Sequence, residues 1–145
     1  MMDNLCCRFI NTDVALQSAF KIRRTVFTDE QGISESQDID GNDSSALHIL
    51  AEHNGKILGT ARLRFTVDKQ AKLERMAVLK PQRGTGIGKG IVSFVETECQ
   101  SRGIENITLN AQYSVIDFYK ACGFREVGLS FLEAGIKHIR MDKTL

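Results

Sequence analysis

The sequence predicts a single layered α/β (α+β) domain with a mixed, partly antiparallel sheet. Two apolar runs flank the pair Asn54-Gly55, which is the strongest short-range signal of an antiparallel hairpin. Farther along, a Gly-rich segment lies between a strand-like run and a helix-like apolar stripe, and strand and helix patterns then alternate to the end. The 145 residues are about the length of one domain and can bury a core without disulfides or a metal.

The first half of the chain predicts a strand, a helix and an antiparallel meander. A strand is expected over 6–10, followed by a helix that begins near Thr12 or Asp13. Residues 28–46 are polar and punctuated by glycine, which predicts a loop with room for a short helical turn. The meander is expected in this order: strands over 48–53 and 56–65, a turn at 68–70, and a strand over 71–79.

The second half predicts alternating strands and helices. Pro81 ends the preceding strand, and the Gly-rich loop leads into a helix that Gly103 caps at its C-terminus. A shorter helix is expected from Ser114, with Asp117 three residues on in a capping-box-like start, to Gly123. The longer helix has an apolar stripe at helical spacing, formed by Ile87, Ile91, Phe94, Val95 and Cys99. The remaining strands are expected over 106–111, 123–128 and 136–141.

Composition excludes several classes of protein. Nineteen Lys and Arg against 18 Asp and Glu give a formal charge of +1, which argues against a nucleic-acid partner. The four cysteines form no C-x-x-C pair and the three histidines are scattered, so we expect free thiols and no metal. No apolar stretch is long enough for a membrane span or a signal peptide, so we expect a cytoplasmic protein without a membrane partner.

The Gly-rich loop over 83–88 has the sequence RGTGIG and lies between a strand and a helix. Glycines allow successive backbone N–H groups to point at one anion, and the helix N-terminus adds its dipole. The nucleotide-binding P-loop pattern fails because Arg83 occupies its first Gly position and Gly90 follows Lys89. The dinucleotide pattern G-x-G-x-x-G fails from either starting glycine. A phosphate-binding loop and a tight structural turn are the two interpretations left.

Three motifs resemble the GNAT superfamily of N-acetyltransferases. Arg83, Gly86 and Gly88 form R-x-x-G-x-G, which is similar to the acyl-CoA signature of that family. The segment LERMAVL at 73–79 resembles its cofactor-contacting strand, and FYKACGF at 118–124 resembles its F-Y-x-x-x-G-F element. The resemblance implies one N-acetyltransferase domain over 1–145, in a bacterial subgroup of uncertain acceptor. It also implies a mixed, mostly antiparallel central sheet of six to seven strands flanked by about four helices.

The resemblance implies transfer of an acetyl group from acetyl-CoA to a primary amine by direct attack in a ternary complex. A backbone N–H at about Met76 would then face the thioester carbonyl and stabilise the developing oxyanion. Asn110 matches a position that often contacts CoA, with a simple strand-end Asn as the alternative. The resemblance implies that CoA contacts the strand residues Met76, Ala77 and Val78 and the loop residues Arg83, Gly84, Thr85, Gly86, Ile87, Gly88 and Lys89.

Two side chains match catalytic roles. Tyr119 matches the family's general acid, which protonates the departing thiolate, and packing on the helix is the alternative. Glu74 is the candidate general base, acting through water, because strand alternation places Glu74 and Met76 on one face, opposite Arg75. An exposed or ion-paired carboxylate is the alternative for Glu74. A covalent route through Cys99 or Cys122 is disfavoured, since neither position has a motif that would activate it.

Residues 25–55 contain seven acidic residues and no Lys or Arg. An acidic wall would favour a cationic acceptor, either a small-molecule amine or the amine of a peptide. Within it, Glu30 and Gln31 are the candidate acceptor-binding residues, and a solvated loop is the alternative. The resemblance leaves open a homodimer, and also a non-catalytic module that binds or senses acyl-CoA. The seven acidic residues are Asp29, Glu30, Glu35, Asp38, Asp40, Asp43 and Glu52.

Overall fold

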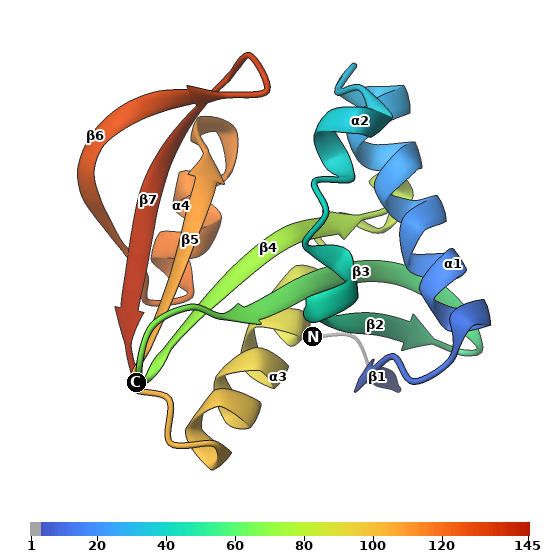
Figure 1. The fold of residues 1–145 in the computed structure, drawn as a ribbon. Coiled ribbons are helices and arrows are strands. Elements are labelled where there is room, and N and C mark those ends of the chain that lie inside the picture. The colour runs from blue at the N-terminus through green and yellow to red at the C-terminus, as the bar shows by residue number, and fades with distance from the viewer. Residues whose placement is uncertain (1–3) are drawn as a thin grey trace.

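A computed structural model describes residues 4–145 and contains one seven-stranded sheet with helices on both faces (Figure 1). Its strands are β1 (Leu5–Phe9), β2 (Leu47–His53), β3 (Lys56–Phe65), β4 (Gln70–Val78), β5 (Asn106–Gln112), β6 (Arg125–Glu133) and β7 (Ile136–Thr144). The order across the sheet is β1-β2-β3-β4-β5-β7-β6. Neighbouring strands are antiparallel except β4 and β5, which are parallel. The mixed, mostly antiparallel sheet expected from the sequence is confirmed.

Four α-helices cover the sheet: α1 (Asp13–Arg23), α2 (Glu35–Asp38), α3 (Ile87–Ser101) and α4 (Ile116–Ala121). The end of α1 continues as a π-helical segment, Arg24–Glu30. Apolar residues of α3 and α4 bury one face of the sheet, whereas α1 and its extension cover the opposite face near β4. Within the described part of the chain, no helix has both the length and the apolar character needed to cross a membrane.

Most of the turn and cap signals are confirmed. Thr12 caps α1 by accepting a hydrogen bond from the backbone N–H of Ala15 at 3.2 Å. Asn54 and Gly55 both have positive φ, 50° and 79°, as the hairpin turn requires. The predicted capping box at Ser114 is wrong, because residues Tyr113–Val115 form a 3₁₀ turn and α4 begins one residue after it. Inside that turn Ser114 does not hold the N-cap position and borders a cleft instead.

The parallel contact between β4 and β5 is short. It pairs Gln70–Lys72 with Asn106–Thr108 and goes no farther. Beyond it, β4 stays paired to β3 up to Val78, and β5 stays paired to β7 up to Gln112. The two strands therefore diverge within one sheet, and each keeps an unpaired inner edge (Figure 1).

A β-bulge interrupts β4 beside this opening. The register with β3 shifts between Glu74 and Ala77, so Arg75 and Met76 lie opposite a single residue of β3. Arg75 has φ of 53°, in the left-handed region that side chains rarely adopt. The ladder between β3 and β4 is disrupted at these two residues, which lie beyond the last position where β4 pairs with β5.

The bulge changes which face each later side chain of β4 occupies. Leu73 packs in the core under α3, whereas Ala77 packs with Ile22 in the cluster under α1. In a regular strand, residues four apart would share a face. Met76 packs toward the α3 side, so it does not share a face with Glu74. The alternation assumed from the sequence for these two residues is wrong, because the extra residue of the bulge reverses it.

Two buried arginines attach the loop after α2 to the sheet. Arg62, fully buried on β3, donates to Asp40 at 2.8 Å and to Asp43 at 3.1 Å. Arg23, at the end of α1, donates to Asp43 at 2.8 Å and to Asp38 at 3.1 Å. Hydrogen bonds from Arg62 lower the pKa of Asp40. Burial alone would raise the pKa of Asp43, but hydrogen bonds from both guanidinium groups lower it.

The substitution Arg62→Met should destabilise the fold strongly. It removes the guanidinium that bridges Asp40 and Asp43 and leaves Arg23 for Asp43 and the partly exposed Arg75 for Asp40, which costs about 3 kcal/mol of unfolding free energy. Arg8→Met is the control, because the pair of Arg8 with Glu52, at 3.4 Å, is largely exposed and should contribute about 1 kcal/mol or less. Urea unfolding at pH 7 measures both values, and equal losses would contradict the role given to the buried arginine.

Candidate active site

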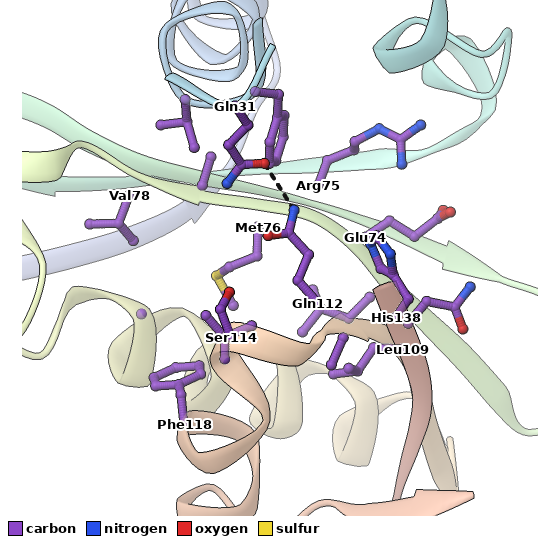
Figure 2. A pocket seen from close by; sticks show the side chains of 18 of the residues that line it. Gln31, Glu74, Arg75, Met76, Val78, Leu109, Gln112, Ser114, Phe118 and His138 are labelled. Atoms are coloured by element: carbon purple, nitrogen blue, oxygen red, sulfur yellow. Dashed lines mark hydrogen bonds between the residues drawn. The ribbon is translucent and has the colours of Figure 1, made fainter. Parts of the chain in front are cut away.

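A cleft of about 740 Å³ occupies the opening between β4 and β5 (Figure 2). Its walls come from both diverging strands, the Gly-rich loop, the start of α3, α4, the segment after α1 and the β6–β7 hairpin. These segments are far apart in sequence and meet only because the sheet opens between its fourth and fifth strands. A cleft of this size, with apolar walls and a few polar groups, is typical of a small-molecule site.

The Gly-rich loop ends in a set of unused hydrogen-bond donors. Gly84 and Gly86 have φ of 79° and 100°, which turns the chain sharply before α3 begins. From Gly84 to Lys89, none of the six backbone N–H groups donates to an acceptor within residues 4–145. Helix α3 adds the positive end of its dipole at the same place. Since Gly84, Ile87 and Gly88 border the cleft, this end of the cleft is suited to bind an anion.

Gly88 also allows the two helices beside the cleft to approach each other. A Cβ at this position would lie 3.1 Å from the ring of Phe118 on α4, closer than almost all real contacts. The Phe118 ring borders the cleft below the Gly-rich loop (Figure 2). The glycine at this position therefore has a packing role in addition to any role in binding.

Arg83 is held by the protein rather than pointing freely from the loop. Its Nε donates to the carbonyl oxygen of Val78 at 2.9 Å, and its Nη2 donates to both carboxylate oxygens of Glu30 at 2.9 and 3.0 Å. Glu30 lies against the Gly-rich loop and does not border the cleft within the described residues. The placement of Glu30 at the acceptor end, expected from the sequence, is therefore corrected.

Gln31 does border the cleft, and it forms a bridge across it. The side chain of Gln112, at the end of β5, donates from Nε2 to Oε1 of Gln31 at 2.9 Å (Figure 2). The two residues are 81 positions apart and come from opposite walls. Gln112 had no distinguishing signal in the sequence beyond its place at the end of a strand.

The other predicted cofactor residues divide into two groups. The cleft is bordered by Met76, Ala77, Val78 and Asn110, and contact of these residues with CoA stays a prediction. The cleft-lining residues do not include Thr85, Gly86 and Lys89. Gly86 shapes the loop, the Thr85 hydroxyl donates to the carbonyl of Gln82, and Lys89 borders a separate hollow of about 170 Å³.

Tyr119 lies at the edge of the apolar core and also borders the cleft. Its ring packs edge-on against Phe118 and Phe124, with centroids 5.0 and 5.8 Å away. Burial raises the pKa of the Tyr119 phenol far above its ordinary value. The hydroxyl therefore keeps its proton throughout the neutral range and is available as a donor to a group bound in the cleft.

Glu74 is surrounded by cations, as the alternative interpretation of this residue expected. Arg64 donates to both of its carboxylate oxygens, Arg62 lies 3.3 Å away, and Lys72 lies 3.8 Å away. Burial alone would raise the pKa of Glu74, but the hydrogen bonds from Arg64 lower it. A carboxylate with a lowered pKa holds a proton weakly, so the structure does not support Glu74 as a general base.

The acidic segment does not form an unbalanced negative wall. Six of its seven acidic residues pair with arginines, and Arg75 of the bulge joins Arg23 and Arg62 in binding the loop after α2. The sequence could not show this, because the arginines come from α1 and the π-helical segment after it, from β1, β3 and β4, and from the Gly-rich loop. The argument from charge for a cationic acceptor therefore loses its basis.

The β6–β7 hairpin contributes polar groups that sequence reasoning largely missed. Its turn, Ala134-Gly135, has two positive φ angles and returns β7 alongside β6. Glu133 and His138, on the two sides of this turn, both border the cleft. From the sequence, His138 and His48 are each a possible proton shuttle, with a structural role as the more common alternative, and the neighbours of His138 in space are set only by the strand pairing.

Comparisons with known proteins agree on one family, and the matches cover nearly the whole chain. Residues 17–145 match the family model described as an acetyltransferase (GNAT) domain. The uncharacterized protein YyaT of Bacillus subtilis is 39% identical over 139 residues, which cover 94% of this chain and 93% of that protein.

Solved structures share the fold at lower identity. The crystal structure of a candidate N-acetyltransferase from Lactobacillus plantarum has a TM-score of 0.91 at 23% identity and covers 99% of both chains. A GNAT family acetyltransferase from Elizabethkingia anophelis, solved with acetyl-CoA bound, has a TM-score of 0.79 at 16% identity. It covers 99% of this chain and 100% of that one.

Proposed function

The chain belongs to the GNAT family of acetyltransferases, and we propose that it moves an acetyl group from acetyl-CoA to a primary amine. The acceptor would attack directly while both substrates are bound. The observation that carries the proposal is the run of six unused backbone N–H groups from Gly84 to Lys89, at one end of the cleft. An anion at the start of α3 would take these hydrogen bonds, and the pyrophosphate of CoA is such an anion.

The divergence of β4 and β5 supports an extended donor beside the loop. Between Lys72 and Val78 the inner edge of β4 has no strand partner, so its backbone groups can pair with an extended amide chain. The pantetheine arm of CoA contains such amides. Bound along Met76 and Val78, it would run from the Gly-rich loop into the cleft. The Elizabethkingia protein, which shares the fold, was solved with acetyl-CoA bound, and this supports the same class of donor here.

The bulge and Tyr119 supply the groups that the reaction requires. The amine nitrogen attacks the thioester carbonyl carbon, and the backbone N–H near Met76 would stabilise the resulting oxyanion. The C–S bond then breaks, and Tyr119 would donate its proton to the departing sulfur. A free thiol has a pKa of about 8.5 and desolvation raises it, so a departing thiolate inside the cleft readily accepts a proton.

Acetyl-CoA and a panel of amines provide the first test of turnover. The panel would contain spermidine, glucosamine, a lysine-containing peptide and free amino acids, and release of the CoA thiol would be followed. We expect acetyl-CoA-dependent thiol release with at least one amine. Because the acidic residues are paired, we expect no systematic advantage for the polycation spermidine. Binding of acetyl-CoA without turnover of any amine would favour the alternative, a module that senses acyl-CoA.

Arg83→Glu should weaken acetyl-CoA binding by at least about tenfold, which is about 1.4 kcal/mol. The variant places a second carboxylate beside Glu30, next to the proposed pyrophosphate site. Arg24→Glu is the control, since Arg24 pairs with Glu35 in an exposed position away from the loop. Calorimetric titration of both variants and the parent gives the Kd values. A folded parent that does not bind acetyl-CoA would overturn the proposed function.

Tyr119→Phe should lower kcat by about 10²- to 10⁴-fold, the usual contribution of a positioned proton donor. The ring and its packing remain, so the Kd for acetyl-CoA should be unchanged. Tyr113→Phe is the matched control, because Tyr113 is the other tyrosine of the chain and is 40% exposed. Equal kcat values for Tyr119→Phe and the parent at pH 6–9 would refute the role of Tyr119 as a proton donor.

A further inference from the structure

The reaction proposed above needs a base that the residues discussed so far do not supply. An alkyl amine has a pKa of about 10.4 and is mostly protonated at neutral pH. It must lose a proton before it can attack, and the paired carboxylate of Glu74 is a poor acceptor for that proton. Of the other candidate bases that border the described part of the cleft, Asp38 and Asp40 are bound by arginines, which leaves His138 and the Glu133 carboxylate beside it.

His138 is fixed in one tautomer by its own strand. Its Nδ1 lies 2.7 Å from the carbonyl oxygen of Ile136. A carbonyl oxygen only accepts hydrogen bonds, so Nδ1 carries a hydrogen, and in the neutral imidazole Nε2 carries the lone pair. The side chain is 6% exposed, and it borders the cleft from β7 (Figure 2).

The surroundings of Nε2 suit a group that gains a proton and then releases it. The carboxylate of Glu133 lies 3.5 Å from Nε2 and would stabilise the imidazolium once it forms. The ring of Phe131 stacks on the imidazole, with centroids 6.0 Å apart at an interplanar angle of 21°, and holds its orientation. Glu133 is about half exposed, so it connects the imidazole to solvent.

His138 also lies at the level of the Gln31–Gln112 bridge. In the register between β5 and β7, Gln112 is the residue directly opposite His138. The bridge crosses from β5 to the segment after α1, so the imidazole is beside the place where the two walls of the cleft meet. Met76 borders the same cleft from β4.

We infer, on the basis of the proposed function, that His138 is the general base that deprotonates the acceptor amine, with Glu133 as its positioning residue. Nε2 takes one proton from the substrate ammonium, and the nitrogen lone pair released by this step forms the C–N bond. The proton leaves the imidazolium for solvent along Glu133. As the C–S bond breaks, Tyr119 donates its proton to the sulfur. The nitrogen of the new C–N bond then loses its second proton, which returns through solvent to the Tyr119 phenolate, so both residues end in their starting states.

Few other charges face the imidazole. From β6 the facing charge is Glu133, and from β5 the opposite residue is the uncharged Gln112. On β7 itself, Arg140 is bound to Asp142, and the ammonium of Lys137 lies over the ring of Tyr113. Across the cleft, Glu74 is bound by Arg64, and Arg75 is bound to the loop after α2. Glu133 is therefore the group with which protonation of His138 is coupled most directly.

His48 provides a matched control. It is also buried, at 7% exposure, and its Nε2 lies 2.8 Å from the carbonyl oxygen of Asp43. Its ring packs edge-on against Phe20 and does not border the cleft within the described residues. His48 therefore supports the loop after α2. Its replacement removes a buried imidazole but leaves the proposed base, His138, in place.

The experiment compares His138→Gln, His48→Gln and the parent with the most active amine of the panel between pH 6 and 10. For His138→Gln we expect a kcat about 10²- to 10⁴-fold lower at pH 7 and an unchanged Kd for acetyl-CoA. Its rate should rise about tenfold per pH unit and approach the parent's rate near the pKa of the amine, where no base is needed. His48→Gln should keep the parent's pH profile, and Glu133→Gln should shift the acidic limb of the parent's profile to lower pH, because the imidazolium loses the carboxylate that stabilises it.

Each outcome decides the inference. A parent without turnover overturns the proposed function and this inference with it. If the parent is active and His138→Gln is equally active, only the role of His138 is overturned. The same holds if the rate of His138→Gln is reduced by the same factor at every pH. Nitrogen NMR of the imidazole gives a test without turnover, because a hydrogen on Nε2 at neutral pH would exclude the assigned tautomer.

Discussion

The short parallel contact between β4 and β5 is the constraint on which the site depends. Three paired positions hold the strands together at one end, and each strand then follows its antiparallel neighbour away from the other. Beyond these positions no strand pairs with the inner edges over the length of the cleft, although Arg83 donates to the carbonyl oxygen of Val78. Such an edge inside a sheet is costly unless something else takes its hydrogen bonds, which makes it a natural site for an extended ligand.

The arginine network provides the rigidity that the open sheet lacks. Arg62 and Arg23 attach the loop after α2 from beneath, and Arg75 attaches it from the bulge of β4. One wall of the cleft is therefore held by buried ion pairs rather than by strand pairing. Hydrogen bonds from these arginines lower the pKa values of Asp40 and Asp43, so this part of a segment that is acidic in sequence supplies support and not proton acceptors. The proton acceptor comes instead from the hairpin on the other wall.

Local signals predicted the elements well, and they failed where the chain departs from regular geometry. The turn at Asn54-Gly55 and the cap at Thr12 depend on neighbouring residues, and both are confirmed. The face of Glu74 was predicted from strict alternation, which one residue with positive φ at the bulge reverses. The start of α4 was predicted from a capping pattern that a 3₁₀ turn displaces.

The sequence by itself determined the family and the order of the elements. These properties reside in short segments whose residues contact one another along the chain. Only the tertiary structure decided the partners of the charged and titratable groups: Glu30 with Arg83, Glu74 with Arg64, and His138 with Glu133. Proton affinity depends on which charges lie within a few ångströms, and strand pairing and packing, rather than position along the chain, set those distances.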